Sequence, residues 1–250
     1  MTLWDISPPV GPDSPLFPGD EPYAVSRTAT IGPGCPVNLT ALTLSPHIGA
    51  HVDAPIHFSP NGGDAASLPL EPFLGVCRVV HLIDDAPDRL ITKDELAAAL
   101  GMADLRDKAD EPSEPAEAGE RAVANDGAAE DAARGASRRG ITGIPQRVLV
   151  RTRRAALTVW RNDFAAFDAD ALRWLAMQGV VLVGIDTPSV DPAESKDLPA
   201  HQALRDTGIV NLENLVLDHV PAGDYELIAL PLKLVGACAS PVRAVLRALP

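Results

Sequence analysis

The stretch SPHIGAHVDAPIHF, residues 45–58, holds three of the chain's six histidines together with an aspartate. These side chains, His47, His51, Asp53 and His57, are separated by four, two and four positions. Two prolines, a glycine and a β-branched valine argue against a helix. In an extended strand all four would point to one face, but four residues of strand span roughly 13 Å, too far for two donors on one ion. The sequence therefore predicts a strand that curls at Gly49, whose backbone torsions permit a tight turn.

The curled segment would bring His47, His51 and Asp53 together as donors. Two imidazoles and a carboxylate suit a divalent cation, with zinc first and manganese or iron as alternatives. Three protein ligands leave a coordination position for water, which is typical of a catalytic site. His57 could be a fourth ligand or a general acid and base, and spacing alone does not choose. The competing interpretation is that His47 and His51 are hydrogen-bonded loop histidines and that Asp53 caps a turn.

The length and net charge of the chain favour some classes of protein and disfavour others. The chain has 250 residues and a formal net charge of -13. This length suits one α/β domain, and an acidic surface disfavours nucleic acid. The start, MTLWDISPPV, has no signal-peptide pattern, and no apolar run is long enough to cross a membrane, so we expect a cytoplasmic protein. Cys35, Cys77 and Cys238 suit a reducing compartment and are interpreted as small buried residues.

Hydrophobic patterning predicts a mixed α/β chain. Strands are expected at 37–45, 75–84, 145–152, 180–186, 209–217, 225–234 and within 240–249, with short strands and turns in the proline-rich residues 1–40. Helices are expected at 92–100, with a Thr92–Glu95 capping box and a stop at Gly101, at 168–179, with an aspartate N-cap and a glycine stop, and at 197–208. Together they predict a single compact domain of mixed β-sheet with helices, spanning residues 1–250.

Residues 104–139 differ in composition from the rest of the chain. They are dense in Ala, Glu, Asp, Gly and Arg and carry almost no large apolar side chain. Such a segment cannot bury enough surface to offset its ordering entropy. We expect a disordered inserted loop, with a short alanine-rich helix or a functional lid as alternatives.

The segment HIGAHVDAPIH, 47–57, fits the pattern HxGxHxDxPxH and resembles the motif of the cyclase family of metal-dependent hydrolases. Within that family the arylformamidase (kynurenine formamidase) branch is the closer match. Further similar stretches are FPGD (17–20), IGPGCPVNLTALTLSPH (31–47), EPFLGVCRVVH (71–81), LVGIDTPSVDPAESK (182–196), PAHQAL (199–204) and DYELIALPLKLVGACASPVRAVLRAL (224–249). The resemblance covers nearly the whole chain outside 104–139 and implies the swivelling β/β/α fold of the family.

The resemblance also implies a binuclear site with two Zn²⁺ per subunit, or Mn²⁺ in their place. It assigns His47, His51 and Asp53 to the first ion, makes Asp53 a bridge, and gives His201 and Glu213 to the second ion. His57 matches the catalytic acid and base. Phe17 falls where the family places an aromatic residue, often Trp, against the substrate ring. Without the resemblance, His201 and Glu213 would be interpreted as a surface histidine and a solvated glutamate.

The implied reaction is hydrolysis of N-formyl-L-kynurenine to L-kynurenine and formate in tryptophan degradation, with metal-activated water as nucleophile. The family implies a homodimer. Lys196 is a candidate partner for the substrate carboxylate, while His81 and His219 are interpreted as a strand-end and a loop histidine. Alternatives are a hydrolase of a cyclic amide such as isatin with one manganese, or a non-catalytic metal-binding protein of the same fold. A metal-free esterase is disfavoured because the sequence has no GxSxG motif.

Overall fold

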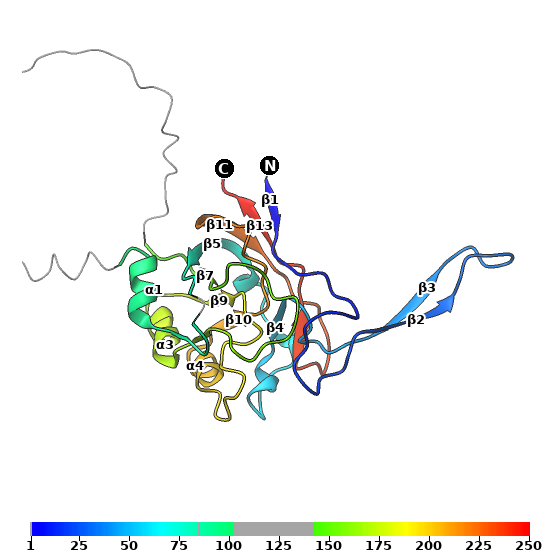
Figure 1. The fold of residues 1–250 in the computed structure, drawn as a ribbon, viewed down its shortest axis with the longest axis horizontal. Coiled ribbons are helices and arrows are strands. Elements are labelled where there is room, and N and C mark those ends of the chain that lie inside the picture. Colours follow the sequence, from blue (N-terminus) through cyan, green and yellow to red (C-terminus); the bar gives the residue numbers. More distant parts are fainter. Residues whose placement is uncertain (1, 85, 103–142) are drawn as a thin grey trace, which may run out of the picture.

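A seven-stranded mixed β-sheet runs through the body of the molecule (Figure 1). The structure is a computed structural model and describes residues 2–84, 86–102 and 143–250, so the predicted insert at 104–139 lies outside the described residues. In sheet order the strands are β1 (Leu3–Asp5), β13 (Val245–Ala248), β11 (Gly223–Ile228), β5 (Leu74–His81), β7 (Arg147–Arg151), β9 (Leu182–Ile185) and β10 (Val210–Leu212). Strands β5, β7, β9 and β10 are parallel, and the remaining pairs are antiparallel.

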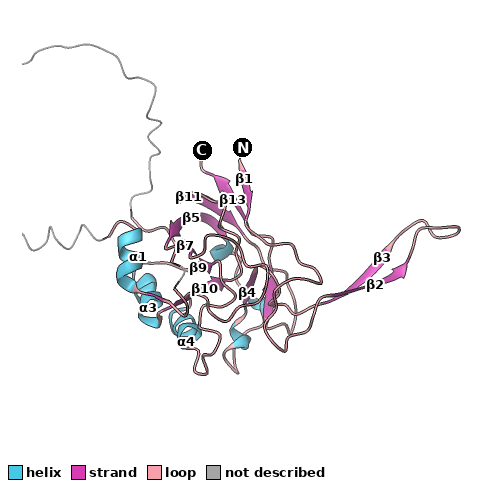
Figure 2. Ribbon diagram, viewed as in Figure 1, coloured by secondary structure: helices cyan, strands magenta, loops and turns pink. Residues whose placement is uncertain are grey.

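Three helices cover one face of this sheet (Figure 2). They are α1 (Lys93–Ala99), α3 (Ala169–Met177) and α4 (Pro199–Thr207). Alternate residues of the central strands, such as Val148, Val150 and Val183, pack against Leu172 and Leu175 of α3 in one apolar cluster. The intervening residues of the same strands face the second cluster, and β9 is buried at every position. A strand covered on both faces needs a continuous apolar sequence, and this confirms the strand predicted at 180–186.

Local capping signals fix where the helices begin and end. The Thr92 side chain accepts the backbone N–H of Glu95, whose carboxylate accepts the backbone N–H of Thr92, so the predicted capping box of α1 is present. Asp168 caps α3 through a 2.8 Å bond from the Asp170 backbone. Gly101 and Gly179 follow these helices with φ of +77° and +84°, a conformation that favours glycine.

The second face of the sheet supports the segment that carries the histidines. Strand β4 (His51–Asp53) pairs with β12 (Ala239–Pro241), and Val52 joins Leu149 and Leu182 in the second apolar cluster. Three short 3₁₀ helices follow: η1 (Pro55–His57), η2 (Ala65–Ser67) and η3 (Glu71–Phe73). A small parallel pair, β6 (Leu90–Ile91) and β8 (Ala166–Phe167), contributes Ile91 and Phe167 to the apolar cluster that the helices cover. The described residues include no helix long and apolar enough to span a bilayer.

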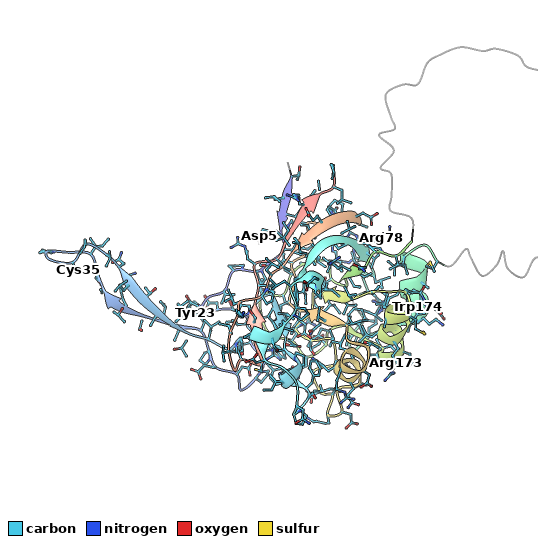
Figure 3. All side chains as sticks on the ribbon, turned by 180° about the vertical axis from the view of Figure 1, so that it is seen from behind. Asp5, Tyr23, Cys35, Arg78, Arg173 and Trp174 are labelled. Carbon is cyan, nitrogen blue, oxygen red and sulfur yellow. The ribbon has the colours of Figure 1, made fainter. Side chains whose placement is uncertain are left out.

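A two-stranded hairpin projects away from this body (Figure 1). It pairs β2 (Ala24–Ala29) with β3 (Leu39–Thr43), and every residue of β3 is exposed. Figure 3 places Tyr23 near its base and Cys35 toward its far end.

The mixed α/β fold is confirmed, while several expected details are wrong. The strand expected at 209–217 ends at Leu212, because Glu213 leaves the sheet edge to bridge to His51 and Asn214 adopts φ +55°. The strand expected at 225–234 ends at Ile228. Cys77 is buried as predicted, but Cys35 and Cys238 are half-buried; all three thiols are free.

Candidate metal-binding and catalytic site

The histidine segment curls where the sequence predicts. Gly49 has φ +66°, and a Cβ there would lie 2.6 Å from the Val10 side chain, so both torsion and space favour glycine. The turn leads directly into β4, where His51 and Asp53 are two positions apart and therefore point to the same side. His47 lies on the turn and approaches them from its other end.

The three predicted donors of the first group converge. Nδ1 of His47 lies 3.0 Å from Oδ1 of Asp53, and Nε2 of His51 lies 3.5 Å from the same oxygen. The His51 and Asp53 side chains are almost completely buried, while that of His47 is 18% exposed. The curled segment thus gathers two imidazoles and one carboxylate from a single short stretch of chain.

The second predicted pair reaches the same point from different elements. His201 lies on α4, and Glu213 directly follows β10, where its backbone exchanges hydrogen bonds of 3.3 and 3.0 Å with His51. Nε2 of His201 is 3.2 Å from Oδ2 of Asp53 and 3.8 Å from Oε1 of Glu213. Oε2 of Glu213 lies 3.3 Å from Nε2 of His51.

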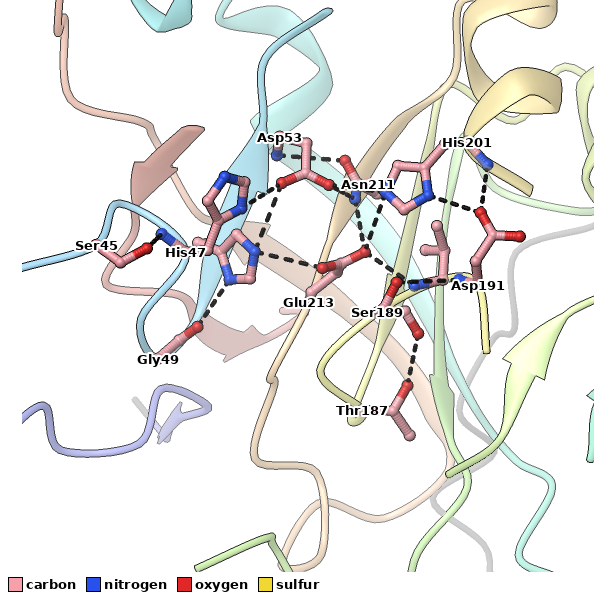
Figure 4. A network of polar contacts seen from close by, with 12 residues as sticks. Ser45, His47, Gly49, Asp53, Thr187, Ser189, Asp191, His201, Asn211 and Glu213 are labelled. Atoms are coloured by element: carbon pink, nitrogen blue, oxygen red, sulfur yellow. Dashed lines mark hydrogen bonds and ion pairs between the residues drawn. The ribbon is translucent and has the colours of Figure 1, made fainter. Parts of the chain in front are cut away.

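Asp53 stands at the centre of this arrangement (Figure 4). Its Oδ1 faces His47 and His51, whereas its Oδ2 faces His201. All five residues expected to bind metal are therefore brought together, with the two carboxylate oxygens of Asp53 directed at different histidines.

The two buried histidines are held with one ring nitrogen aimed inward. Nδ1 of His51 lies 2.9 Å from the carbonyl oxygen of Gly49, and Nδ1 of His201 lies 2.7 Å from Oδ2 of Asp191. When each Nδ1–H donates to its oxygen, each Nε2 keeps its lone pair for the centre. Asp191 also accepts the backbone N–H groups of Ala200 and His201, at 2.9 Å each.

Asn211 ties the carboxylates together. Its Nδ2 donates to Oδ2 of Asp53 at 2.7 Å and to Oε1 of Glu213 at 3.0 Å, and its Oδ1 accepts the Asp53 backbone N–H at 3.3 Å. Oε1 of Glu213 also accepts the backbone N–H of Val190. Asn211 and Asp191 were not among the residues predicted for the site. The position of Asn211 two residues before Glu213 was a usable signal, because alternate strand residues share a face.

The charges of this cluster depend strongly on one another. Burial alone would lower the pKa of His51, but Asp53 and Glu213 overcome it and raise that pKa to about 10. Burial also opposes the charged form of His201, yet Asp191 and Asp53 raise its pKa to about 10. The same contacts hold the pKa of Asp53 well below its usual range, against the effect of burial. Positive charge is thus strongly favoured between these carboxylates.

A divalent cation fits this donor set. Nε2 of His51 and Oδ1 of Asp53 are buried and make no hydrogen bond within the described chain, because their close contacts lack hydrogen-bond geometry. Buried polar atoms without partners are costly unless a ligand satisfies them. Imidazole nitrogens and carboxylate oxygens are the donors that zinc and similar ions take, and a cation replaces the protons that the two histidines would otherwise hold.

A cavity of about 640 Å³ opens onto the cluster. His57 ends η1 and is exposed at this cavity, with its ring 4.3 Å from that of His47 and 5.8 Å from that of His201. Desolvation lowers the pKa of His57. The charge of Asp53 acts in the opposite direction, while His47 and His201 lower this pKa further. A group with a depressed pKa beside a buried donor cluster is placed to accept a proton at neutral pH.

The cavity lining includes two aromatic side chains and one cysteine thiol. Phe17, the expected substrate-binding residue, lies edge-to-face with Trp160 at a ring separation of 5.2 Å. Cys238 also lines the cavity, with Sγ 3.3 Å from Nε2 of His47. Trp160 and Cys238 were missed by sequence reasoning. Lys196 is exposed and is not part of the lining, whereas His81 and His219 lie at a strand end and on a loop, as expected.

Comparison with known proteins identifies a matching family and similar proteins. The family described as "Putative cyclase" matches residues 4–192. The chain is 50% identical to the kynurenine formamidase of Paracidovorax citrulli over 98% of this chain and 96% of that one. It is 48% identical to the kynurenine formamidase of Bordetella pertussis over 99% and 98% of the two chains.

Solved structures share the fold. One described as a potential metal-dependent hydrolase with cyclase activity superposes with a TM-score of 0.69 at 25% identity, covering 98% of this chain and 96% of that one. An isatin hydrolase bound to thioisatinate superposes with a TM-score of 0.68 at 19% identity, covering 98% and 91%. The likeness to the isatin hydrolase concerns the fold alone.

Proposed function

The chain belongs to the cyclase family, and from this premise we propose that it hydrolyses the formamide bond of N-formyl-L-kynurenine to give L-kynurenine and formate. The observation that carries the proposal is a buried cluster of imidazoles and carboxylates at the floor of an aromatic-walled cavity. Full-length identity of 48–50% to kynurenine formamidases supports this substrate.

Two divalent ions per subunit, with zinc first, are the proposed cofactors. His47, His51 and Asp53 would hold one ion, and His201 and Glu213 would hold the other with Asp53 shared between them. The opposite directions of the two Asp53 oxygens support this sharing. Bound ions of this kind activate water and polarise a carbonyl oxygen.

His57 is proposed as the general acid and base. Its depressed pKa leaves the ring neutral at pH 7, so it can take a proton as water attacks the formyl carbon and return it to the departing aryl nitrogen. The formyl group carries a single hydrogen, which leaves the carbon open to approach. Phe17 and Trp160 are proposed to contact the aromatic ring and so orient the bond that breaks.

A homodimer and a cytoplasmic location complete the proposal. The hairpin β2–β3 supports the dimer, because it exposes Val25, Leu39 and Leu42 at 53–58% on strands that nothing in the described chain covers. The three free thiols suit a reducing compartment.

The proposed function is tested by assaying N-formylkynurenine and isatin side by side, with metal counted by elemental analysis. We expect release of kynurenine and formate, loss of that activity on chelation, recovery with Zn²⁺, and two ions per chain. Preferential opening of isatin with one ion per chain would support the cyclic-amide alternative instead. Activity that persists in the fully stripped protein would refute the metal-dependent assignment.

A further inference from the structure

The mouth of the cavity carries a carboxylate that the mechanism above does not use. Asp20 ends the FPGD segment and lines the cavity together with Glu21. Asp20 is half-buried and Glu21 is exposed, and we call these two residues the mouth of the cavity. The hydroxyl of Ser45 donates to Oδ2 of Asp20 at 2.8 Å, and the oxygen of Ser45 accepts the backbone N–H of His47 at 3.2 Å. Asp20 is therefore held in a defined position beside the start of the histidine segment.

Asp20 and the donor cluster line the same cavity. The Ser45 side chain connects them, because it contacts both Oδ2 of Asp20 and the backbone N–H of His47. Cys238 lines this cavity too, with Sγ 3.3 Å from Nε2 of His47. One small molecule in this cavity of about 640 Å³ can therefore face both Asp20 and the cluster.

Outside the donor cluster, the described cavity lining carries carboxylates but neither lysine nor arginine. These carboxylates are the side chains of Asp20 and Glu21. Glu213 belongs to the donor cluster, whereas Asp20 and Glu21 lie outside it. N-formylkynurenine carries an α-ammonium and an α-carboxylate, and outside the donor cluster this lining offers carboxylate partners to the ammonium but no lysine or arginine to the carboxylate.

Taking the proposed function as given, we propose that Asp20, assisted by Glu21, binds the ammonium group of the substrate and selects aryl formamides that carry a cationic amine. The unpartnered, buried Nε2 of His51 lines the same cavity and marks the floor that a ligand must reach. Phe17 and Trp160 line the same cavity and contact each other edge-to-face. The substrate carboxylate is dispensable for recognition.

Four substrates separate these contributions. N-formylkynuramine lacks the carboxylate, 4-(2-formamidophenyl)-4-oxobutanoate lacks the amine, and 2′-formamidoacetophenone lacks both; N-formylkynurenine is the reference. We expect kcat/KM for N-formylkynuramine to stay within about threefold of the reference, and that for the deaminated acid to fall about tenfold or more, as loss of one charge-assisted contact predicts.

Substitutions of Asp20 and Glu21 then test whether these residues cause the preference for substrates with an amine. Asp20→Asn should lower the ratio of kcat/KM for N-formylkynuramine over 2′-formamidoacetophenone about tenfold, mainly through KM. Glu21→Gln, at an exposed position, should lower the same ratio about threefold. Asp13→Asn is the matched control, because Asp13 is an exposed acid of the same N-terminal segment outside the cavity lining. It should leave the ratio unchanged.

The inference is overturned if the deaminated acid is preferred over N-formylkynuramine, or if neither Asp20→Asn nor Glu21→Gln changes the ratio. If none of the four formamides is hydrolysed by the zinc-loaded protein, the proposed function fails, and the inference fails with it. Hydrolysis of the neutral formamide without selection for the amine refutes the inference alone.

Discussion

His57 differs from the other histidines of the site in how little holds its ring. Within the described chain its ring makes no hydrogen bond, whereas His51 and His201 are each fixed through Nδ1. It also stands at the open side of the cluster. A ring that is free to exchange protons suits a general acid and base better than a fixed ligand.

We therefore expect His57→Ala to cut kcat by a factor of about 10²–10⁴ while the metal content stays full. Steady-state kinetics and elemental analysis of the same preparation measure both quantities. His219→Ala is the control, because His219 is an exposed loop histidine paired with Asp218. A parallel loss of metal in His57→Ala would identify His57 as a ligand instead.

Asp191 is buried and reaches the site through His201. Replacing it by Asn should weaken metal binding about 10–100-fold, since the acceptor that orients the His201 ring is impaired. Competition with a chromophoric chelator measures the affinity. Because Asp191 also caps α4, thermal unfolding of the metal-free protein separates loss of fold from loss of affinity. Asp197→Asn, at an exposed position of the same loop, should change neither.

The spacing of one short segment was enough to predict a cluster of His47, His51 and Asp53. It could not reveal Asn211, which contacts Asp53 from 158 positions away, because that contact depends on the tertiary fold. His201 and Glu213 came from family resemblance for the same reason. Roles at this site remain predictions, although the side chains themselves are brought together.

Among the elements, strands β7 and β9 are connected at their ends by a buried carboxylate, Asp186, whose charged form burial disfavours. Asp186 follows β9 and accepts the backbone N–H groups of Thr152 and Arg153 and the Thr152 hydroxyl, just past the end of β7. Burial nevertheless raises its pKa from 3.8 to about 6, against the effect of these hydrogen bonds. Folding therefore favours its protonated form more than the unfolded chain does.

This shift gives the pH dependence a definite sign. The folded pKa lies above the unfolded one, so the contribution is fully present below pH 4 and is lost as the pH rises through 6. A shift of two units corresponds to about 3 kcal/mol. The free energy of unfolding of Asp186→Asn relative to wild type should therefore rise by up to this amount between pH 4 and 7. Urea unfolding of both metal-free proteins measures it, and a pH-independent difference would contradict it.

Helix boundaries followed from local chemistry, whereas several strand ends did not. The capping box at Thr92 and the glycine after α3 act within a few residues, so sequence suffices to place them. Strand β10 ends early because Glu213 pairs with β4, a strand far away in sequence. The sequence also could not predict that the β2–β3 hairpin projects from the body, because strand propensity does not say whether a strand joins the main sheet.

The hairpin β2–β3 offers a test of the proposed dimer. Val25 and Leu42 are paired across its strands, so they share one face. Leu42→Asp should convert the dimer to a monomer of half the mass, measured by light scattering, because a charge cannot be buried there without a partner. Ser26→Asp, on the opposite face, is the control. A wild-type protein that is monomeric at micromolar concentration would refute the dimer.

For the molecule as a whole, the remaining question is whether residues 104–139 take part in its chemistry. The described chain stops at Met102 and resumes at Gly143. Met102 and Ile144, near the two ends, pack against the apolar cluster beneath the helices, and the described cavity lining includes no residue from either flank. The acidic, alanine-rich composition gives this segment little apolar surface with which to join a core.

We expect replacement of 104–139 by a Gly/Ser linker of about ten residues to leave metal content and kcat/KM unchanged. The shorter loop should alter the free energy of unfolding by no more than about 1 kcal/mol, because closure entropy depends on the logarithm of loop length. Elemental analysis, kinetics and urea unfolding of the same variant test each part. A loss of kcat/KM with full metal content and unchanged stability would mean instead that the segment acts as a lid over the cavity, since fold and cofactor would then both be intact.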